Sequence, residues 1–298
     1  MFIKPALLSS LLLVPVALAV PALLSPSSDK PSTSLDVRYA NPSETTVPSS
    51  GASYGSAPGN SERDSGNSTT GSSSGGSPAN GVDFSIWDLQ LPVGTPGNPE
   101  TIAGSKLSTY TDPKKEYYYT DSSTGAIVMK VPGSPASTGC VTTTNSKHCR
   151  TEFDETTPAS WDPKAATNSM TSTLMVVKAD NSQHGTCIGQ IHIEESVSVR
   201  PVAELYYNSQ GELSMGVEQT RQGGDETVTT VGSVPVGTKF SYTIAYENNE
   251  LSVAINGGEK KALSTYQLDA PPSYFKAGNY NQGSDSSEIH FFGIEVKH

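Results

Sequence analysis

The stretch GQIHIE, residues 189–194, alternates polar and apolar side chains. In a β-strand, successive side chains point to opposite faces. Gln190, His192 and Glu194 would therefore share one face, and the two isoleucines would share the other. The isoleucine face is suited to the core of a sheet. An amide, an imidazole and a carboxylate side by side are unusual on a plain solvent-facing strand, so we interpret this strand as the floor of a groove.

Two further segments carry polar residues in the same alternation. Residues 149–154, CRTEFD, place Arg150, Glu152 and Asp154 on one face. In YFKAGNYNQ, residues 274–282, the even positions do the same for Tyr274, Lys276, Tyr280 and Gln282. Each strand alone shows only what any solvent-facing strand shows. If the strands are neighbours in one sheet, their cations, imidazole, phenol and amides converge on one surface.

The part of the chain after residue 80 has almost no helical periodicity and many short alternating runs separated by Gly, Pro, Asn and Asp. About a dozen short strands of this kind predict an all-β fold of two packed antiparallel sheets. Residues 197–199 are predicted as one of the strands, and 160–168 as a short helix. Asn256-Gly257 is a hairpin signal, and Gly278 inside a strand indicates a bulge or a close approach of another chain.

The first 80 residues differ from the rest in composition. Residues 1–19 carry Lys4 near their start, continue with an apolar run and end in A-L-A, as secretory signal peptides do; an N-terminal anchor is the alternative. Residues 20–80 are rich in Ser, Gly and Pro and predict a disordered linker, with an N-glycosylation acceptor at Asn67. We expect 81–298 to be the catalytic domain of a secreted, extracellular protein.

The formal net charge of −11 argues against a general nucleic-acid binder. It also means that an anionic substrate needs a locally cationic groove. We expect no membrane partner and a monomeric protein. Cys140 and Cys149 are nine residues apart and flank a loop-like stretch, which predicts a disulfide between them in an exported protein. Cys187 is left over in an apolar strand, and the scattered histidines argue against a zinc site.

The three polar strands resemble a known family. RTE at 150–152, QIH at 190–192 and YFKAGNYNQ at 274–282 look like the signature strands of polysaccharide lyase family 7, the alginate lyases. WDLQLP at 87–92 is similar to that family's first strand, and the resemblance covers residues 83–296. It implies a β-jelly roll with a concave groove for an anionic polysaccharide, which the enzyme cleaves by β-elimination.

The chain departs from the family pattern at Asp154, where a second arginine is usual. A carboxylate in place of a cation should weaken the binding of an anionic polymer nearby.

β-Elimination from a 4-linked uronate removes the proton at C5 and expels the oxygen at C4. The charge that develops on the adjacent carboxylate must be neutralised or shared. Arg150 and Gln190 are the candidates, because a forked cation and an amide donor suit a planar carboxylate. Glu152, two residues from Arg150 on the same face, would hold the guanidinium in place.

His192 and Tyr280 are the candidates for proton transfer. An imidazole with an ordinary pKa of about 6.5 is largely neutral near pH 7 and can accept the C5 proton. A phenol can donate to the departing oxygen or act as the base itself. The resemblance implies that His192 serves guluronate residues and Tyr280 both roles for mannuronate. Lys276 would bind the carboxylate of a neighbouring sugar, and Gln282 would also contact substrate. No cofactor or metal is required.

Three other functions are also compatible with the sequence. A glucuronan lyase would use the same chemistry on another uronan. A non-catalytic carbohydrate-binding module would need stacking aromatic residues but no imidazole and phenol in register. A glycoside hydrolase would need two carboxylates at catalytic separation, for which Glu218 and Glu226 are conceivable.

Overall fold

The structure is a computed structural model, and it describes residues 81–298. The predicted signal peptide (1–19), the predicted linker (20–80) and the glycosylation acceptor at Asn67 lie outside the described residues. The boundaries between these segments therefore stay predictions. None of the helices within 81–298 is long and apolar enough to cross a membrane.

The described chain folds into two antiparallel sheets, which confirms the predicted all-β class. The first sheet holds eight strands in the spatial order β10 (Thr227–Ser233), β9 (Glu212–Val217), β8 (Pro201–Tyr207), β7 (Thr186–Ile193), β14 (Ser273–Tyr280), β5 (Arg150–Glu155), β1 (Trp87–Thr95) and β2 (Asn98–Ile102). The second holds seven, in the order β13 (Lys261–Leu263), β12 (Glu250–Ile255), β11 (Lys239–Glu247), β6 (Ser169–Lys178), β15 (Ser287–Lys297), β4 (Ile127–Val131) and β3 (Tyr118–Thr120).

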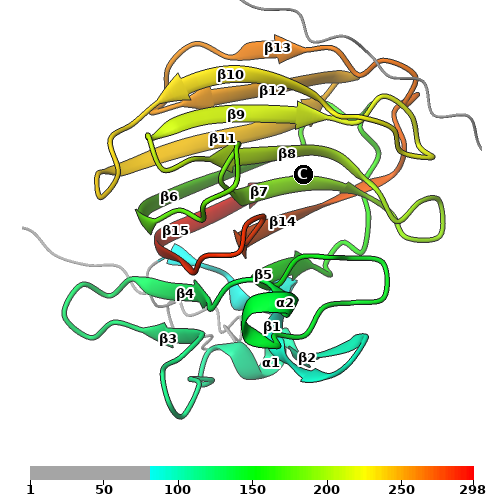
Figure 1. Ribbon diagram of the computed structural model, residues 1–298. Coiled ribbons are helices and arrows are strands. Elements are labelled where there is room, and N and C mark those ends of the chain that lie inside the picture. The colour runs from blue at the N-terminus through cyan, green and yellow to red at the C-terminus, as the bar shows by residue number, and fades with distance from the viewer. Residues whose placement is uncertain (1–80) are drawn as a thin grey trace, which may run out of the picture. The chain divides into compact units, whose positions relative to one another are not determined.

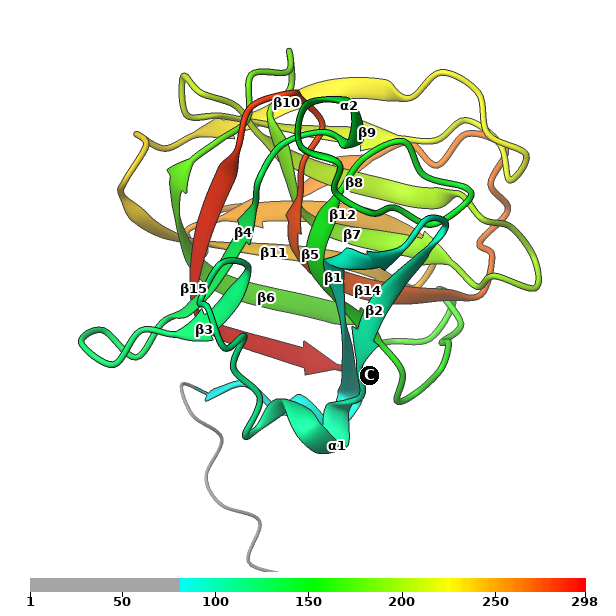
Figure 2. The same ribbon diagram turned by 60° about the horizontal axis from the view of Figure 1, so that its bottom comes forward.

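The two sheets pack face to face as a sandwich of curved strands (Figures 1 and 2). Helical structure is confined to short connections within the described residues: a 3-10 turn at Phe84–Ile86, α1 (Gly104–Leu107) and α2 (Pro135–Thr138). Strands that carry the polar motifs lie at the centre of the first sheet, because β7, β14 and β5 are consecutive in its order.

The core lies between the sheets and is filled by the apolar half of each alternating strand. Ile191 and Ile193 are fully buried, as the alternation predicted. On β5 the ring of Phe153 stacks on that of Trp87, with the ring centres 5.9 Å apart. Burying a side chain of this size contributes about 1.5–3 kcal/mol. The polar halves of β7, β14 and β5 are thereby directed to the outer face of the first sheet.

Two glycines mark places where another group comes too close for a side chain. A Cβ at Gly189 would overlap the hydroxyl of Tyr242, which donates to the carbonyl of Ile188 at 2.7 Å. A Cβ at Gly278 would overlap the backbone of Glu152. The pairing of β14 with β7 also shifts register between Ala277 and Tyr280. The predicted bulge at Gly278 is therefore confirmed, and the group that approaches it closely is the neighbouring strand β5 of the same chain.

Two predicted elements are wrong, and in each case local bonds explain why. Residues 160–168 form turns and not a helix, because the backbone of Trp161 pairs with Ser273 and its ring packs 4.6 Å from that of Phe275. Residues 197–199 form a turn and not a strand, because the backbone N–H groups at 197 and 198 both donate to the carbonyl of Glu194.

The hairpin signal at Asn256-Gly257 is confirmed. Asn256 and Gly257 have φ values of 54° and 64° and begin the loop, residues 256–260, that connects β12 to its antiparallel partner β13. Asn and Gly tolerate this left-handed region better than other residues.

Candidate active site

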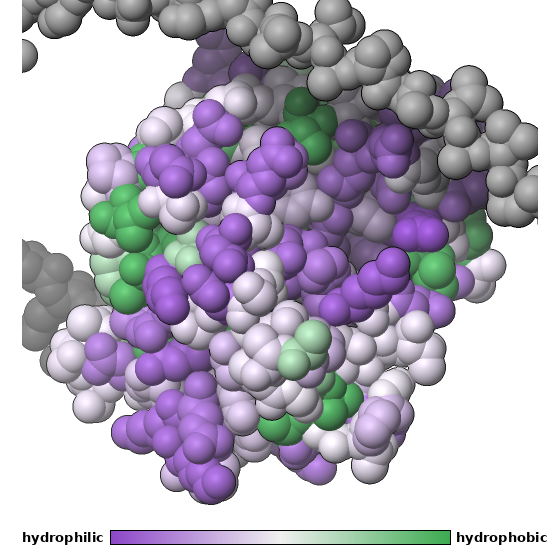
Figure 3. Space-filling view, in the orientation of Figure 1, coloured by the Kyte–Doolittle hydropathy of each residue, from purple (hydrophilic) through white to green (hydrophobic). Residues whose placement is uncertain are grey.

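The three polar motifs come together on the outer face of the first sheet. Lys276 pairs across the sheet with Gln190 on one side and with Asp154 on the other. Tyr274 pairs with His192, and Tyr280 with Arg150 in the same register. Their side chains line a groove of about 500 Å³. Figure 3 shows this side of the molecule hollowed and covered mainly by hydrophilic side chains.

Glu152 is the hub at the floor of the groove. It is fully buried and accepts from Arg150 Nη1 at 2.8 Å and from Gln190 Nε2 at 2.6 Å. Lys276 Nζ lies 3.2 Å from the same carboxylate. Burial opposes ionisation, but Lys276 and Arg150 prevail and lower the pKa of Glu152. The ionised carboxylate therefore holds a guanidinium, an amide and an ammonium in one place. The sequence predicted this role of Glu152 for the guanidinium only.

Each of these three groups keeps hydrogen-bond donors that Glu152 does not use. The Arg150 guanidinium has five N–H groups, and its buried Nε has no partner in the protein. The second amide hydrogen of Gln190 is not used by Glu152. The Lys276 ammonium has three N–H donors, of which one remains after its contacts with Glu152 and Asp154. All three residues line the groove. The floor of the groove can therefore donate hydrogen bonds to a planar anion above it.

His192 presents one ring nitrogen to the groove in an unprotonated state. Its Nδ1 lies 2.8 Å from the carbonyl oxygen of Ile193, and only a protonated Nδ1 can donate to it. In the neutral ring, Nε2 is then the free acceptor. Burial, followed by the charges of Lys276 and Arg150, lowers the pKa of His192 to about 3. The imidazole is therefore neutral near pH 7 and available as a base.

Tyr280 pairs with Arg150 across the sheet and lies beside the loop that precedes β5. The Arg150 guanidinium carbon is 3.7 Å from the centre of the Tyr280 ring, a cation–π geometry. The phenol oxygen is 3.0 Å from the hydroxyl of Ser146, and the His148 ring packs edge-on against the phenol at 6.1 Å. Burial raises the pKa of Tyr280 despite the opposing charge of Arg150. The phenol is therefore protonated near pH 7.

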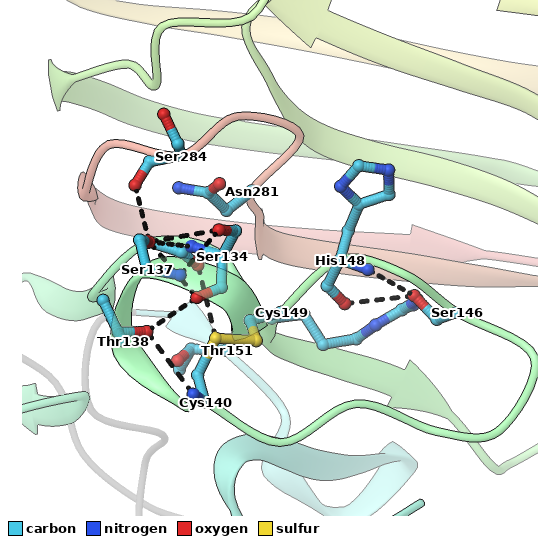
Figure 4. The surroundings of a disulfide bond; sticks show 12 residues. Ser134, Ser137, Thr138, Cys140, Ser146, His148, Cys149, Thr151, Asn281 and Ser284 are labelled. Carbon is cyan, nitrogen blue, oxygen red and sulfur yellow. Dashed lines mark hydrogen bonds between the residues drawn. A yellow bond between two sulfur atoms is a disulfide. The ribbon is translucent and has the colours of Figure 1, made fainter.

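A disulfide closes the loop over this end of the groove. Cys140 and Cys149 are bonded, with their Cα atoms 6.2 Å apart, which confirms the predicted pair; Cys187 is a buried free thiol. Figure 4 shows the bridge between α2 and the start of β5, with Ser146 and His148 on the loop that it closes. The loop therefore enters the strand from a fixed position.

Asp154 occupies part of the space in which Lys276 was expected to meet a substrate carboxylate. Lys276 Nζ is 2.8 Å from Asp154 Oδ1, and the Lys276 side chain is almost fully buried. Its positive charge is thus shared between Asp154 and Glu152. The role of Lys276 in binding a neighbouring sugar stays a prediction, and so does that of Gln282, which lines the groove and donates to the backbone carbonyl of Tyr280 at 3.2 Å.

The end of the groove on the β8 side is acidic. Glu204 and Glu218 line it, and Tyr206 donates to Glu204 at 2.7 Å while lying 2.9 Å from Glu226. Tyr206 has one proton, so one carboxyl group must be the donor in the second contact. Burial and then the charge of Glu204 raise the pKa of Glu226 to about 9, which makes Glu226 the protonated partner.

Sequence reasoning missed several groove residues. Ser146 and His148 lie on a loop, where no alternation marks a face. Glu204 is on a strand whose other residues are mostly buried, and Arg200 follows the turn that was mistaken for a strand. All four line the groove. Within the described residues, no three His, Cys, Asp or Glu side chains form a cluster suited to a metal ion.

Comparisons with known proteins agree with this geometry. The family model described as alginate lyase matches residues 82–298. The alginate lyase PA1167 from Pseudomonas aeruginosa is 28% identical, over 73% of this chain and 100% of its own, with a TM-score of 0.61. A variant of the family 7 alginate lyase A1-II' in complex with its product GGG is 25% identical, over 74% and 98%, with a TM-score of 0.62. Among curated proteins, none matches.

The β-jelly roll and its groove place the protein among the polysaccharide lyases. The chain belongs to the alginate lyase family, polysaccharide lyase family 7.

Proposed function

We propose that this protein is a secreted, monomeric enzyme that depolymerises alginate by β-elimination at 4-linked uronates and leaves unsaturated uronate ends. One observation carries the proposal: a neutral imidazole and a protonated phenol, on adjacent strands, line one groove together with Arg150 and Gln190. The alginate lyase A1-II' has been crystallised with a GGMG substrate, which supports alginate as the polymer. Secretion rests on the sequence of residues 1–19 alone.

The first step is recognition of the uronate carboxylate at the cleavage site. The donors that Glu152 leaves free on Arg150 and Gln190 hydrogen-bond its two oxygens. Such preorganised donors act where charge develops in the transition state. They are held in place before substrate arrives, because Glu152 already fixes both groups at 2.8 and 2.6 Å. Neutralising the carboxylate makes the adjacent C5–H acidic enough to lose its proton.

The second step is proton transfer. His192 Nε2 takes the C5 proton, the electron pair of that bond forms the C4–C5 double bond, and the C4–O bond breaks. Tyr280 donates its proton to the departing oxygen. When C5–H lies on the Tyr280 side, as in the opposite epimer, Tyr280 first releases its proton to solvent. The phenolate then takes the C5 proton, and the resulting phenol returns it to the leaving oxygen. Both routes use groups already present on the groove walls.

The experiment is digestion of alginate and of glucuronan by the exported domain, followed by ultraviolet absorbance of the unsaturated uronate and by reducing-end assay. We expect both signals with alginate. Both signals with glucuronan alone would identify a glucuronan lyase. New reducing ends without absorbance would identify a hydrolase, and binding without either signal would identify a carbohydrate-binding module.

A further inference from the structure

Ser146 joins the disulfide-closed loop to the groove. Its Oγ is 3.0 Å from the Tyr280 hydroxyl and 3.3 Å from Arg150 Nη2. The same oxygen is 3.1 Å from the backbone N of His148 and 3.0 Å from the His148 carbonyl oxygen. A serine on a loop thus contacts both a candidate acid and the cation beside it.

Counting donors and acceptors sets the direction of the contact with Tyr280. A serine hydroxyl offers one proton and two lone pairs. The N–H of His148 and the Nη2–H of Arg150 can only donate, and together they occupy both lone pairs of Ser146. A third donor, the Tyr280 O–H, would have no lone pair left to bond. The Ser146 proton must then serve either the Tyr280 oxygen or the His148 carbonyl, and only the first choice makes the 3.0 Å contact with Tyr280 a hydrogen bond.

We propose that Ser146 is a positioning residue that donates its proton to the Tyr280 oxygen. This leaves the phenol proton of Tyr280 directed into the groove toward the leaving oxygen. It also gives the phenolate a donor once that proton has gone. The inference rests on the proposed role of Tyr280 as the acid of the elimination, because Ser146 acts only through that phenol.

The surroundings of Tyr280 show that this one donor matters. Burial raises the pKa of the phenol, and Arg150 and the Ser146 hydrogen bond lower it. Glu204 on β8 and Glu152 on β5 oppose them and raise it. Two further titratable neighbours are neutral near pH 7. Burial lowers the pKa of the His148 ring that packs on the phenol, and burial raises the pKa of the Cys187 thiol that pairs with Tyr280 from β7. Arg150 and Ser146 are therefore the groups that stabilise the phenolate.

The direction of the hydrogen bond has a measurable sign. A fluorinated tyrosine placed at position 280 gives a single fluorine resonance whose pH titration reports the pKa of that phenol alone. If Ser146 donates, Ser146→Ala removes a bond to the charged form, and the pKa of residue 280 rises. If Ser146 accepts, the lost bond is to the neutral form and the pKa falls. A fall or no change would overturn the proposal.

Matched variants separate this effect from damage to the loop. Ser146→Thr keeps a hydroxyl and should titrate close to the parent. Thr142→Ala removes a hydroxyl from the same loop without lining the groove and should leave the titration and the activity unchanged. Melting temperatures of all variants check that the domain is folded. If Ser146→Thr also titrates like the alanine variant, the hydroxyl is not the cause and the proposal fails.

Kinetics distinguish the inference from the proposed function. On alginate we expect Ser146→Ala to lower kcat roughly tenfold with little change in KM, the size of one hydrogen bond to a charged group. Tyr280→Phe should lower kcat much further. An active Tyr280→Phe enzyme would end the proposed role of Tyr280. An inactive Tyr280→Phe enzyme beside a fully active Ser146→Ala enzyme would end the Ser146 proposal alone.

Discussion

The carboxyl group at the centre of the groove and the one beside its acidic end hold their charge in opposite ways. At the centre, Arg150 and Lys276 lower the pKa of Glu152 and keep it ionised. At the acidic end, burial and Glu204 raise the pKa of Glu226 to about 9 and keep it protonated.

This difference explains how a chain with a formal net charge of −11 can offer a site for a polyanion. Counting acidic residues overstates the negative charge of the groove, because part of it is removed by proton sharing around Tyr206. The cations at the centre are anchored by a carboxylate that lies beneath them, away from the substrate side.

Neutralising Glu152 should have the largest effect on stability and activity, whereas neutralising Glu226 should have little. Glu152→Gln leaves two buried cations without their shared partner, which costs about 3–5 kcal/mol for such a pair. We expect a loss of this order in the free energy of unfolding and at least a hundredfold loss in kcat/KM. Urea unfolding and steady-state kinetics on alginate measure both.

The matched control is Glu226→Gln, which replaces a carboxyl group that is already neutral. Its effect on unfolding should stay below about 1 kcal/mol when measured below the unfolded-state pKa of about 4.3, where the folded and unfolded states both hold this proton. Equal destabilisation by the two variants would contradict the assigned charge states.

The two regions should also give opposite dependences of stability on pH. Glu152 has a lowered pKa in the folded state, so its stabilisation is present above its unfolded-state pKa and is lost as the pH falls through the folded value. Glu226 has a raised pKa, so its stabilisation is present below its unfolded-state pKa and is lost as the pH rises toward about 9.

Urea unfolding of the parent and of Glu226→Gln across this pH range isolates the second effect. The parent should lose stability relative to the variant as the pH rises. A constant difference between the two proteins would show that Glu226 does not hold a proton.

The lowered pKa of His192 at the centre of the groove predicts how activity depends on pH. Burial and the charges of Lys276 and Arg150 lower the pKa of His192 to about 3, so this base is already neutral at pH 5. The kcat/KM of the free enzyme on guluronate-rich alginate should therefore not decline between pH 7 and pH 5 on account of this residue. A decline in kcat/KM centred at a pH of about 6.5, the ordinary pKa of an imidazole, would show that the pKa of His192 is not lowered in solution.

Asp154 gives the smallest expected change. Asp154→Asn removes the carboxylate 2.8 Å from Lys276 and leaves the ammonium more of its charge for substrate. We expect KM on alginate to fall about threefold, as for a partly exposed ion pair, with kcat unchanged. Glu212→Gln, exposed at the start of β9, removes an equal charge far from Lys276 and controls for the overall field. An unchanged KM for Asp154→Asn would mean that Lys276 does not meet the substrate.

The sequence predicted the strands of the site better than their surroundings. Alternation placed Arg150, His192 and Tyr280 on outward faces, because the period of a strand leaves only two choices. Ser146 could not be found in this way, since a loop has no period and its position depends on the disulfide and on the backbone of His148. The pairing of Lys276 with Asp154 depends on the register between β14 and β5, and neither segment read by itself predicts that register.

The most direct test of the account is proton NMR of the products formed from alginate by the parent protein and by the combined variant His192→Ala, Tyr280→Phe. The parent should generate the olefinic signal of an unsaturated uronate. The folded double variant should generate it at least a thousandfold more slowly, as expected when both proton-transfer groups are removed. Undiminished formation of that signal by the double variant would show that the elimination takes place without these two residues.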